Sequence, residues 1–326
     1  MREKIKNTSA KEKYSIFIVL FVMIFLCSFL NKNFLSPNNV SNIMKQLAVS
    51  TILAYGEMLL IISGMLDLSS GAVLALSGVI SIITYKTTGS LLLAVIVAIV
   101  VAVACNLVNA FMITQLNAPP FIATLVMMQV ARGVALLITD GQNILQLKDY
   151  VIFGQGSIGP IPISILITAV ITVIIWYILR HTRLGRSLYA IGGNEEASVA
   201  AGIKVKKNKY IVFLINGVLV GIAGILFMSR VNAGLPNGAI GYEMEGLTAA
   251  IVGGTSFSGG VGTAFGTLAG AFIIGCLNNI MNLVGVDSYI QQIVKACIIA
   301  LAVIWDIKSK SKKTKKVILV EEKKAA

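Results

Sequence analysis

The sequence is poor in the residue types that usually carry catalysis or bind metals. Its 326 residues include one histidine and two tryptophans, and 13% of them are charged. The histidine, His181, has no carboxylate beside it in the chain. Four cysteines fall in four separate apolar runs, without a partner at metal-ligand spacing, and are interpreted as buried apolar thiols: Cys27, Cys105, Cys276 and Cys297. We therefore expect no catalytic site, no metal site and no enzyme activity in this chain.

Charge is also scarce for a soluble protein. A soluble domain carries about 25% charged residues, whereas 56% of this chain is hydrophobic. The apolar residues form long runs, such as Leu91–Thr114 and Ile161–Leu179, and neither of these runs contains a charge. About 20 apolar residues in a helix cross the ~30 Å hydrocarbon core of a bilayer, where a helix satisfies its own backbone polar groups. The sequence therefore predicts an all-α, polytopic membrane protein.

We expect about ten transmembrane helices, which together form a single transmembrane domain over residues 14–305. The predicted spans are Tyr14–Leu30, Ile43–Ser63, Leu68–Tyr85, Leu91–Thr114, Phe121–Ile138, Ile161–Leu179, Ile211–Val231, Gly246–Ser258, Thr263–Val284 and Tyr289–Trp305. No small-residue cleavage site follows the first span, so it is interpreted as an uncleaved anchor. The eighth span is short and glycine-rich, and we expect it to be a broken or re-entrant element.

The positions of lysine and arginine predict the orientation of the chain. The tail at 1–13, the loop at 180–210 and the tail at 306–326 together hold 20 of the 27 basic residues. With ten spans all three segments lie on one side, which the positive-inside rule makes cytoplasmic. The net charge of +13 is then explained by topology and anionic membrane lipid, without nucleic acid. We expect a multi-pass protein of the cytoplasmic (inner) membrane.

The cytoplasmic loop contains a short segment with helix signals at both ends. The Asn194 side chain can cap the free backbone N–H groups of a first helical turn, and Glu195 and Glu196 place negative charge at the positive end of the helix dipole. Gly202 can adopt the left-handed conformation that ends a helix. We therefore expect a two-turn helix on the cytoplasmic face that transmits force from a soluble motor, although an ordinary connecting helix remains an alternative.

Glycine is concentrated in the segment 246–270. The stretch Gly253–Gly260 lacks the Gly-Lys-Ser/Thr ending of a phosphate-binding loop, and glycine in lipid allows close helix approach or a break that lines a cavity. The stretch shares glycine, serine and glycine at the same offsets with Gly64–Gly71, which suggests a weak internal repeat of the kind that transporters carry. Any ATPase that drives this chain must accordingly be a separate protein.

Polar residues inside the apolar runs are expensive in a bilayer, so by default they face protein or water. Amides and hydroxyls would suit a neutral polyol substrate, although asparagines also bond between helices, and Arg132, Arg230 and Lys295 can extend to the interface instead. Our candidates for a translocation pathway are Glu57, Asp67, Asn106, Asn109, Gln129, Asn216, Asn278 and Asn279. Two outer loops, at 140–159 and 232–245, are placed where an extracytoplasmic partner could dock, although connecting loops are the default interpretation.

Several stretches resemble one known family over nearly the whole chain. The matching residues lie in Gly192–Val205, in Gly241–Glu243 and Gly253–Gly262, in Asp67–Gly71, in Phe121–Gly133 and in Leu277–Asn279. These stretches are similar to those of the ribose-type permeases of bacterial ABC sugar importers. The coupling ending Ile-x-Leu-Pro of other ABC importers is missing at Ile203–Val205, so we carry over the docking role of this loop alone.

The resemblance implies a homodimer or paired permease, a cytoplasmic ATP-binding cassette protein that holds ATP and Mg, and an extracytoplasmic binding protein that delivers a monosaccharide. It also implies that Asn194, Glu195, Glu196 and Gly202 lie at the interface with the ATPase. One rival is the same machine carrying a nucleoside or a branched-chain amino acid. A different class of rival is an ion-coupled symporter with Glu57 and Asp67 as its coupling carboxylates.

Overall fold

The computed structural model describes residues 2–301, 303–304 and 308. The predicted C-terminal tail at 306–326 therefore lies outside the described residues, apart from Lys308. The predicted N-terminal tail does not stand apart from the first span, because a single helix, α1, runs over Arg2–Leu30.

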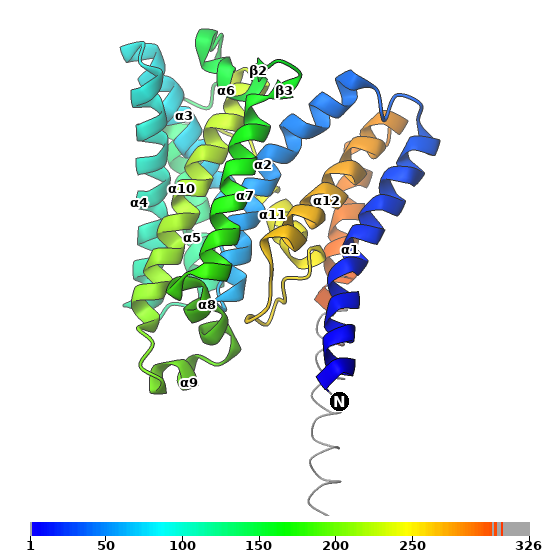
Figure 1. Ribbon diagram of the computed structural model, residues 1–326. Coiled ribbons are helices and arrows are strands. Elements are labelled where there is room, and N and C mark those ends of the chain that lie inside the picture. Colours follow the sequence, from blue (N-terminus) through cyan, green and yellow to red (C-terminus); the bar gives the residue numbers. More distant parts are fainter. Residues whose placement is uncertain (1, 302, 305–307, 309–326) are drawn as a thin grey trace, which may run out of the picture.

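The described chain is built almost entirely from helices (Figure 1). The longer helices are α1 (Arg2–Leu30), α2 (Pro37–Ile62), α3 (Ser70–Thr88), α4 (Leu91–Thr114), α5 (Pro120–Leu137), α7 (Ile163–His181), α10 (Val205–Val231) and α12 (Ala264–Val284). The shorter elements are η1 (Lys148–Val151), α6 (Ile152–Gln155), α8 (Arg183–Gly193), α9 (Glu195–Ala200), α11 (Tyr242–Val252) and the strands β1 (Ile144–Leu145), β2 (Ser157–Ile158), β3 (Ile161–Pro162) and β4 (Ala233–Gly234). A last apolar helix covers Ser288–Leu301.

Seven helices of the described part are long and apolar enough to cross a membrane: α2, α3, α4, α5, α7, α10 and α12. The apolar part of α1, Ile16–Leu30, and the last apolar helix, Ser288–Leu301, overlap the first and last predicted spans. The eighth predicted span corresponds to α11, whose 11 residues reach about half the ~30 Å of a hydrocarbon core. The all-α, polytopic character predicted from the sequence is confirmed, and α11 is too short to be a full span.

Helices α2 and α10 form the centre of the bundle. In the most apolar 18-residue stretch of each helix, 89% of α2 and 72% of α10 are buried within the protein, compared with 22% of α4. Gly217 and Gly221 bring α10 against the backbone of α4, because a Cβ atom at either position would meet Val103 or Ile99 Cα within 2.8 Å. Small residues that let helix backbones approach closely are the usual means of packing in lipid. The outer helices leave many apolar side chains exposed, as helices that face lipid do.

The predicted repeat is a repeated helix ending. Gly64 and Gly254 both have positive φ and follow α2 and α11. The N–H of Met65 donates to the Leu60 carbonyl, and the N–H of Thr255 donates to the Ala250 carbonyl, each at 2.9 Å. This hydrogen bond is the mark of the Schellman motif, which ends a helix at a glycine. The two helix ends correspond at Gly64 and Gly254, one residue away from the offset of the predicted repeat, which paired Gly64 with Gly253.

The two predicted outer loops meet in a small sheet. Strand β1 pairs antiparallel with β4, with Ile144 opposite Gly234 and Leu145 opposite Ala233. Figure 1 shows α6, β2 and β3 at this end of the bundle, and α8, α9 and the beginning of α1 at the opposite end. The prediction of four buried thiols is confirmed for Cys27 and Cys276, whereas Cys105 is half-buried and Cys297 is exposed. Cys297 lies on the last helix, on a side that no described segment covers.

Candidate functional site

The predicted cytoplasmic helix is present as α9, and a second helix precedes it. Asn194 ends α8 and begins α9, and its side-chain oxygen accepts the Ala197 N–H at 2.8 Å. Gly202 has φ +79°, and the Ile203 N–H donates to the Ser198 carbonyl at 3.0 Å. Both predicted helix ends are therefore confirmed. The preceding helix, α8, was missed, although Thr182 is a good N-cap whose hydroxyl accepts the Gly185 N–H at 3.2 Å.

Helix α9 stands out from the protein with most of its side chains exposed. Glu195 forms an ion pair with Lys209 at 2.8 Å, which joins the start of α9 to α10. The Glu195 side chain is 52% exposed, so this pair contributes little stability and mainly fixes orientation. Glu196 is exposed, and Val199 is 60% exposed one helical turn further along. These two side chains share a helix face, which offers a carboxylate and an apolar contact to a partner.

Five of the eight pathway candidates meet in one buried cluster between α2, α3, α4 and α10. We call this group the carboxylate network: Glu57, Asp67, Asn106, Asn109 and Asn216, with Ser69 and Ser70 between them. Among the described residues neither carboxylate has an ion pair, and both lie in the core, with Glu57 at 0% and Asp67 at 1% exposure. A buried charge without a partner is strongly unfavourable, so hydrogen bonds or a bound proton or cation must balance these groups.

Hydrogen bonds surround Asp67 on both of its carboxylate oxygens. Oδ1 accepts the N–H of Ser69 at 2.8 Å and also the Ser69 hydroxyl, and Oδ2 accepts Asn216 Nδ2 at 2.8 Å. Asn216 Nδ2 also donates to Asn106 Oδ1 at 2.9 Å, and Asn109 Nδ2 donates to the Ser69 hydroxyl at 3.0 Å. Helices α4 and α10 are thus tied to the break between α2 and α3 through Asp67 and its neighbour Ser69.

Glu57 approaches the same break from α2. Its Oε1 atom lies 2.6 Å from the Ser70 hydroxyl, and its Oε2 atom accepts the Asp67 N–H at 3.3 Å. The Ser70 hydroxyl also lies 3.1 Å from the Asp67 carbonyl oxygen. A hydroxyl has one proton to donate. The Ser70 hydroxyl can donate this proton to the Asp67 carbonyl if Glu57 is protonated and donates to the Ser70 oxygen.

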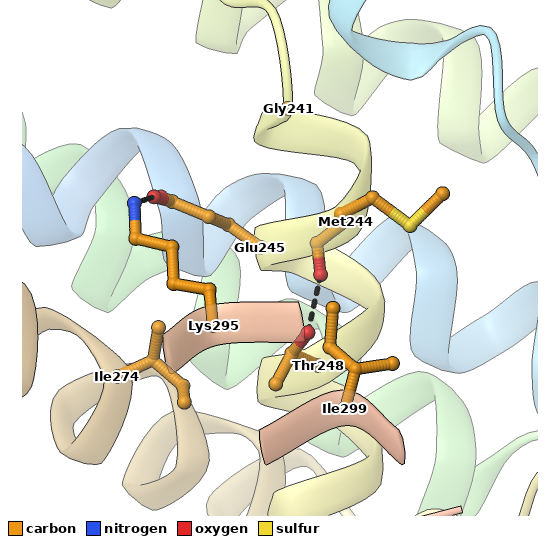
Figure 2. A pocket seen from close by; sticks show the side chains of 7 residues that line it. All are labelled: Gly241, Met244, Glu245, Thr248, Ile274, Lys295 and Ile299. Atoms are coloured by element: carbon orange, nitrogen blue, oxygen red, sulfur yellow. Dashed lines mark hydrogen bonds and ion pairs between the residues drawn. The ribbon is translucent and has the colours of Figure 1, made fainter. Parts of the chain in front are cut away.

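A second polar cluster lies at α11 and was not found from the sequence (Figure 2). Lys295 Nζ lies 2.6 Å from Glu245 Oε1, and Asn278 Nδ2 donates to the same oxygen at 3.1 Å. The Ser50 hydroxyl donates to Glu245 Oε2 at 3.3 Å. Glu245 had been assigned to an outer loop, and Lys295 had been allowed to extend to the interface. The structure instead joins them, at 10% and 30% side-chain exposure, together with the candidate Asn278.

A small cavity of about 30 Å³ lies beside this ion pair, between α11, α12 and the last helix. Figure 2 shows Glu245, Lys295 and Ile274 toward the left of the view and Met244, Thr248 and Ile299 toward the right. A cavity of this size holds one or two water molecules.

The remaining candidates lie apart from both clusters. Asn279 exchanges two hydrogen bonds of 2.9 Å with Asn39, which clamps α12 to the start of α2. Gln129 is exposed on α5. Arg132 donates to the carbonyl oxygens of Pro236 at 2.6 Å and Gly238 at 2.8 Å, so it ties α5 to the segment before α11.

The chain is similar to a known protein family over most of its length. Residues 39–303 match the family described as "Branched-chain amino acid transport system / permease component". The chain is 41% identical to the ribose import permease protein of Escherichia coli strain K12 over 296 residues, covering 89% of this chain and 92% of that protein. It is 37% identical to the ribose import permease protein of Bacillus subtilis strain 168 over 310 residues, covering 94% and 96%.

The D-allose transport system permease protein of Escherichia coli strain K12 is 34% identical over 298 residues, covering 90% of this chain and 91% of that protein. No solved structure matches the chain. These relatives are permease proteins and not enzymes, and a chain with this match and these apolar helices is a multi-pass protein of the inner membrane. The chain belongs to the family of permease components of the branched-chain amino acid transport system.

Proposed function

We propose that this chain is the transmembrane permease subunit of an ABC importer for a monosaccharide, a ribose-like pentose or a related sugar. The observation that carries the proposal is its 34–41% identity, over about nine-tenths of its length, to permeases named for ribose and D-allose. The family description names branched-chain amino acids, so this substrate class is the second candidate.

The proposed topology has ten helical elements, with both termini and the loop at 180–210 in the cytoplasm. The beginning of α1 and the pair α8 and α9 lie at the same end of the bundle in Figure 1, which supports this orientation. In this topology α11 is a half-crossing that begins within the membrane, and the glycine-rich break at 253–263 completes the descent. Residues 14–305 form one permease domain between basic cytoplasmic tails.

The proposed partners dock at the two ends of the bundle. A separate ATPase, which holds ATP and Mg²⁺, binds α9 and the residues that shape it: Asn194, Glu195, Glu196 and Gly202. An external sugar-binding protein docks where β1 and β4 join the outer loops. A second permease subunit, identical or related, completes the membrane part.

Transport then follows alternating access. Closure of the ATPase pushes on α9, the helices rock, and sugar released by the binding protein passes inward. The carboxylate network and the Glu245–Lys295 pair with Asn278 offer hydroxyl-binding groups along this route, whereas the candidates Asn279 and Gln129 lie apart from both clusters. Both clusters flank a broken helix, which is where transporters place their substrate path.

Reconstitution into proteoliposomes tests the proposed function. We expect uptake of a labelled pentose when the ATPase, its ATP and the binding protein are all present, and no uptake when any of them is omitted. Uptake by the chain alone, driven by a proton or sodium gradient, would support an ion-coupled symporter with Glu57 and Asp67 and would overturn the proposal. Uptake of leucine in place of pentose would support an ATP-driven permease whose substrate is a branched-chain amino acid.

Replacement of Asn194 by alanine should weaken coupling to the ATPase. Loss of an N-cap costs a helix about 1 kcal/mol. A helix of six residues is not stable by itself, so this loss should affect the shape of α9 directly. We expect about fivefold weaker binding of the ATPase, the equivalent of that energy, measured by titrating the ATPase onto permease in nanodiscs. Asn208→Ala removes a half-buried asparagine near the start of α10, whose side chain donates to the Lys204 carbonyl and caps no helix, and should bind normally. Equal binding by both variants would contradict the capping role.

A further inference from the structure

Helix α8 ends against the backbones of two broken helices. A Cβ atom at Gly192 would overlap the carbonyl oxygen of Ile62 and would come within 2.6 Å of the Gly260 nitrogen. The Gly260 N–H itself donates to the Ile62 carbonyl at 2.9 Å. A Cβ atom at Gly259 would meet the Gly192 carbonyl oxygen at 2.8 Å. We call this contact of Ile62, Gly192, Gly259 and Gly260 the glycine junction.

A second bond fastens α8 to the same loop. The Tyr189 hydroxyl, one turn before Gly192, donates to the Gly262 carbonyl at 2.8 Å. Burial raises the pKa of Tyr189, so the phenol keeps the proton that this bond requires. Helix α8 therefore holds the break at 253–263 at two points.

The glycine junction connects the cytoplasmic helices with both intramembrane clusters. Ile62 is the last residue of α2, five residues after Glu57 and five before Asp67. The break at 253–263 joins α11, which carries Glu245, to α12, which carries Asn278. On the other side, α8 shares Asn194 with α9. A displacement of α9 is thus passed to α8 and from α8 to both breaks.

The chemistry of the contact suits this task. Glycines place backbone against backbone, so no flexible side chain lies between the three segments to absorb a displacement, and close-packed atoms transmit strain. Gly259 and Gly260 both have positive φ, at +82° and +72°, a conformation that glycine adopts without steric cost. The loop can therefore turn sharply enough to reach α8.

We propose that Gly192 is a positioning residue that transmits the movement of α8 and α9 to the two broken helices at once. This inference rests on the proposed function, because it assigns the route by which the ATPase stroke enters the membrane. The route runs through α8, a helix that precedes the docking helix and makes its contact on the membrane side.

Adjacent glycines supply a matched pair of variants for the test. Gly192→Ala forces α8 away from Ile62, whereas a Cβ atom at Gly193 meets nothing within 4 Å. Both substitutions change helix propensity equally, since both residues end α8. In proteoliposomes containing the complete transporter, we expect Gly192→Ala to lower the sugar imported per ATP hydrolysed by about tenfold. Gly193→Ala should stay within about twofold of the wild type.

Several readouts separate a transmission role from a folding defect. Gly192→Ala should still assemble with the ATPase and keep basal ATP hydrolysis, while stimulation by the loaded binding protein is lost. If Gly192→Ala fails to assemble, Tyr189→Phe tests the same transmission role. This variant removes one hydroxyl at the same contact and should lower the import per ATP by about threefold. Tyr177→Phe, at an exposed tyrosine of α7, is its control.

The outcomes distinguish this inference from the proposed function. Wild-type uptake that needs no ATPase would overturn the proposed function and the inference with it. Wild-type uptake that needs the ATPase, with equal import per ATP for Gly192→Ala and Gly193→Ala or for Tyr189→Phe and Tyr177→Phe, would overturn the inference alone.

Discussion

Replacement of Lys295 by methionine should destabilise the protein strongly, because it leaves the Glu245 carboxylate in the bundle without its counter-charge. Methionine keeps the apolar stem of the lysine and removes the ammonium group that lies 2.6 Å from Glu245 Oε1. Removal of one partner from a fully buried ion pair costs about 3–5 kcal/mol, chiefly through the charge that remains, and this pair, with Lys295 at 30% exposure, should lose somewhat less. We expect a much lower yield of folded protein and a lower thermal midpoint in detergent, measured by size-exclusion chromatography after heating.

The partner variant and the double variant complete a cycle for this pair. Glu245→Gln should cost less, because the Lys295 side chain is 30% exposed and Glu245 is 10% exposed. The double variant Lys295→Met with Glu245→Gln should recover most of the loss, since the glutamine can still bond with Asn278 and Ser50. Lys86→Met, which removes an exposed lysine bonded to the Leu145 carbonyl, should leave the midpoint unchanged. A double variant as unstable as Lys295→Met would show that charge pairing is not the cause.

The helices were predictable because the bilayer demands long apolar runs. The predicted span Leu91–Thr114 has the same bounds as helix α4, because a run without charged residues lies between Ser90 and Gln115. At 63–69 and 253–263 glycine and serine recur through each break, so local composition does not locate the helix end. There the end is set by Gly64 and Gly254, whose Schellman bonds depend on backbone conformation and shift the apparent repeat by one residue.

Side-chain partners that are distant in the sequence were not predictable. Asn106 and Asn109 lie three residues apart, so their common face on α4 follows from helix geometry. The bond from Asn216 to Asp67 joins residues 149 positions apart, and the pair of Glu245 and Lys295 spans 50 positions. Neither pairing leaves a local pattern. The polarity of Glu245 even favoured an outer loop, because its role depends on α11 beginning inside the bundle.

Helix α8 was missed because the sequence analysis took 180–210 as a loop around a single short helix. Its closing residues, Gly192–Gly193, give no helix signal, since glycine inside a helix is unfavourable by about 1 kcal/mol relative to alanine. The structure shows what offsets that cost at Gly192, where the α2 end and the loop at 253–263 approach too closely for any side chain. Gly192 lowers the helix propensity of the segment, but the tertiary contact of α8 requires it.

The carboxylate network gives the second large effect, and two nearly isosteric substitutions should separate its two acids. Asp67→Asn should disrupt the network, because each carboxylate oxygen of Asp67 accepts a donor, from Ser69 on one side and from Asn216 on the other. An asparagine must point its NH₂ group at one of these donors. Asn216 can turn its own oxygen toward Asp67 only by giving up its 2.9 Å bond to Asn106. An unsatisfied buried donor costs about 1–3 kcal/mol.

Glu57→Gln should be tolerated, which makes it the control for Asp67→Asn. The glutamine NH₂ group can donate to the Ser70 hydroxyl, which then donates to the Asp67 carbonyl 3.1 Å away, while the glutamine oxygen still accepts the Asp67 N–H. Thermal midpoints in detergent and ATP-driven uptake should therefore fall for Asp67→Asn and stay near wild type for Glu57→Gln. An ion-coupled carrier that uses Glu57 would show the reverse, because glutamine cannot release a proton or bind a cation by charge. The same pair of variants thus tests the hydrogen-bond assignment and the choice between an ATP-driven and an ion-driven permease.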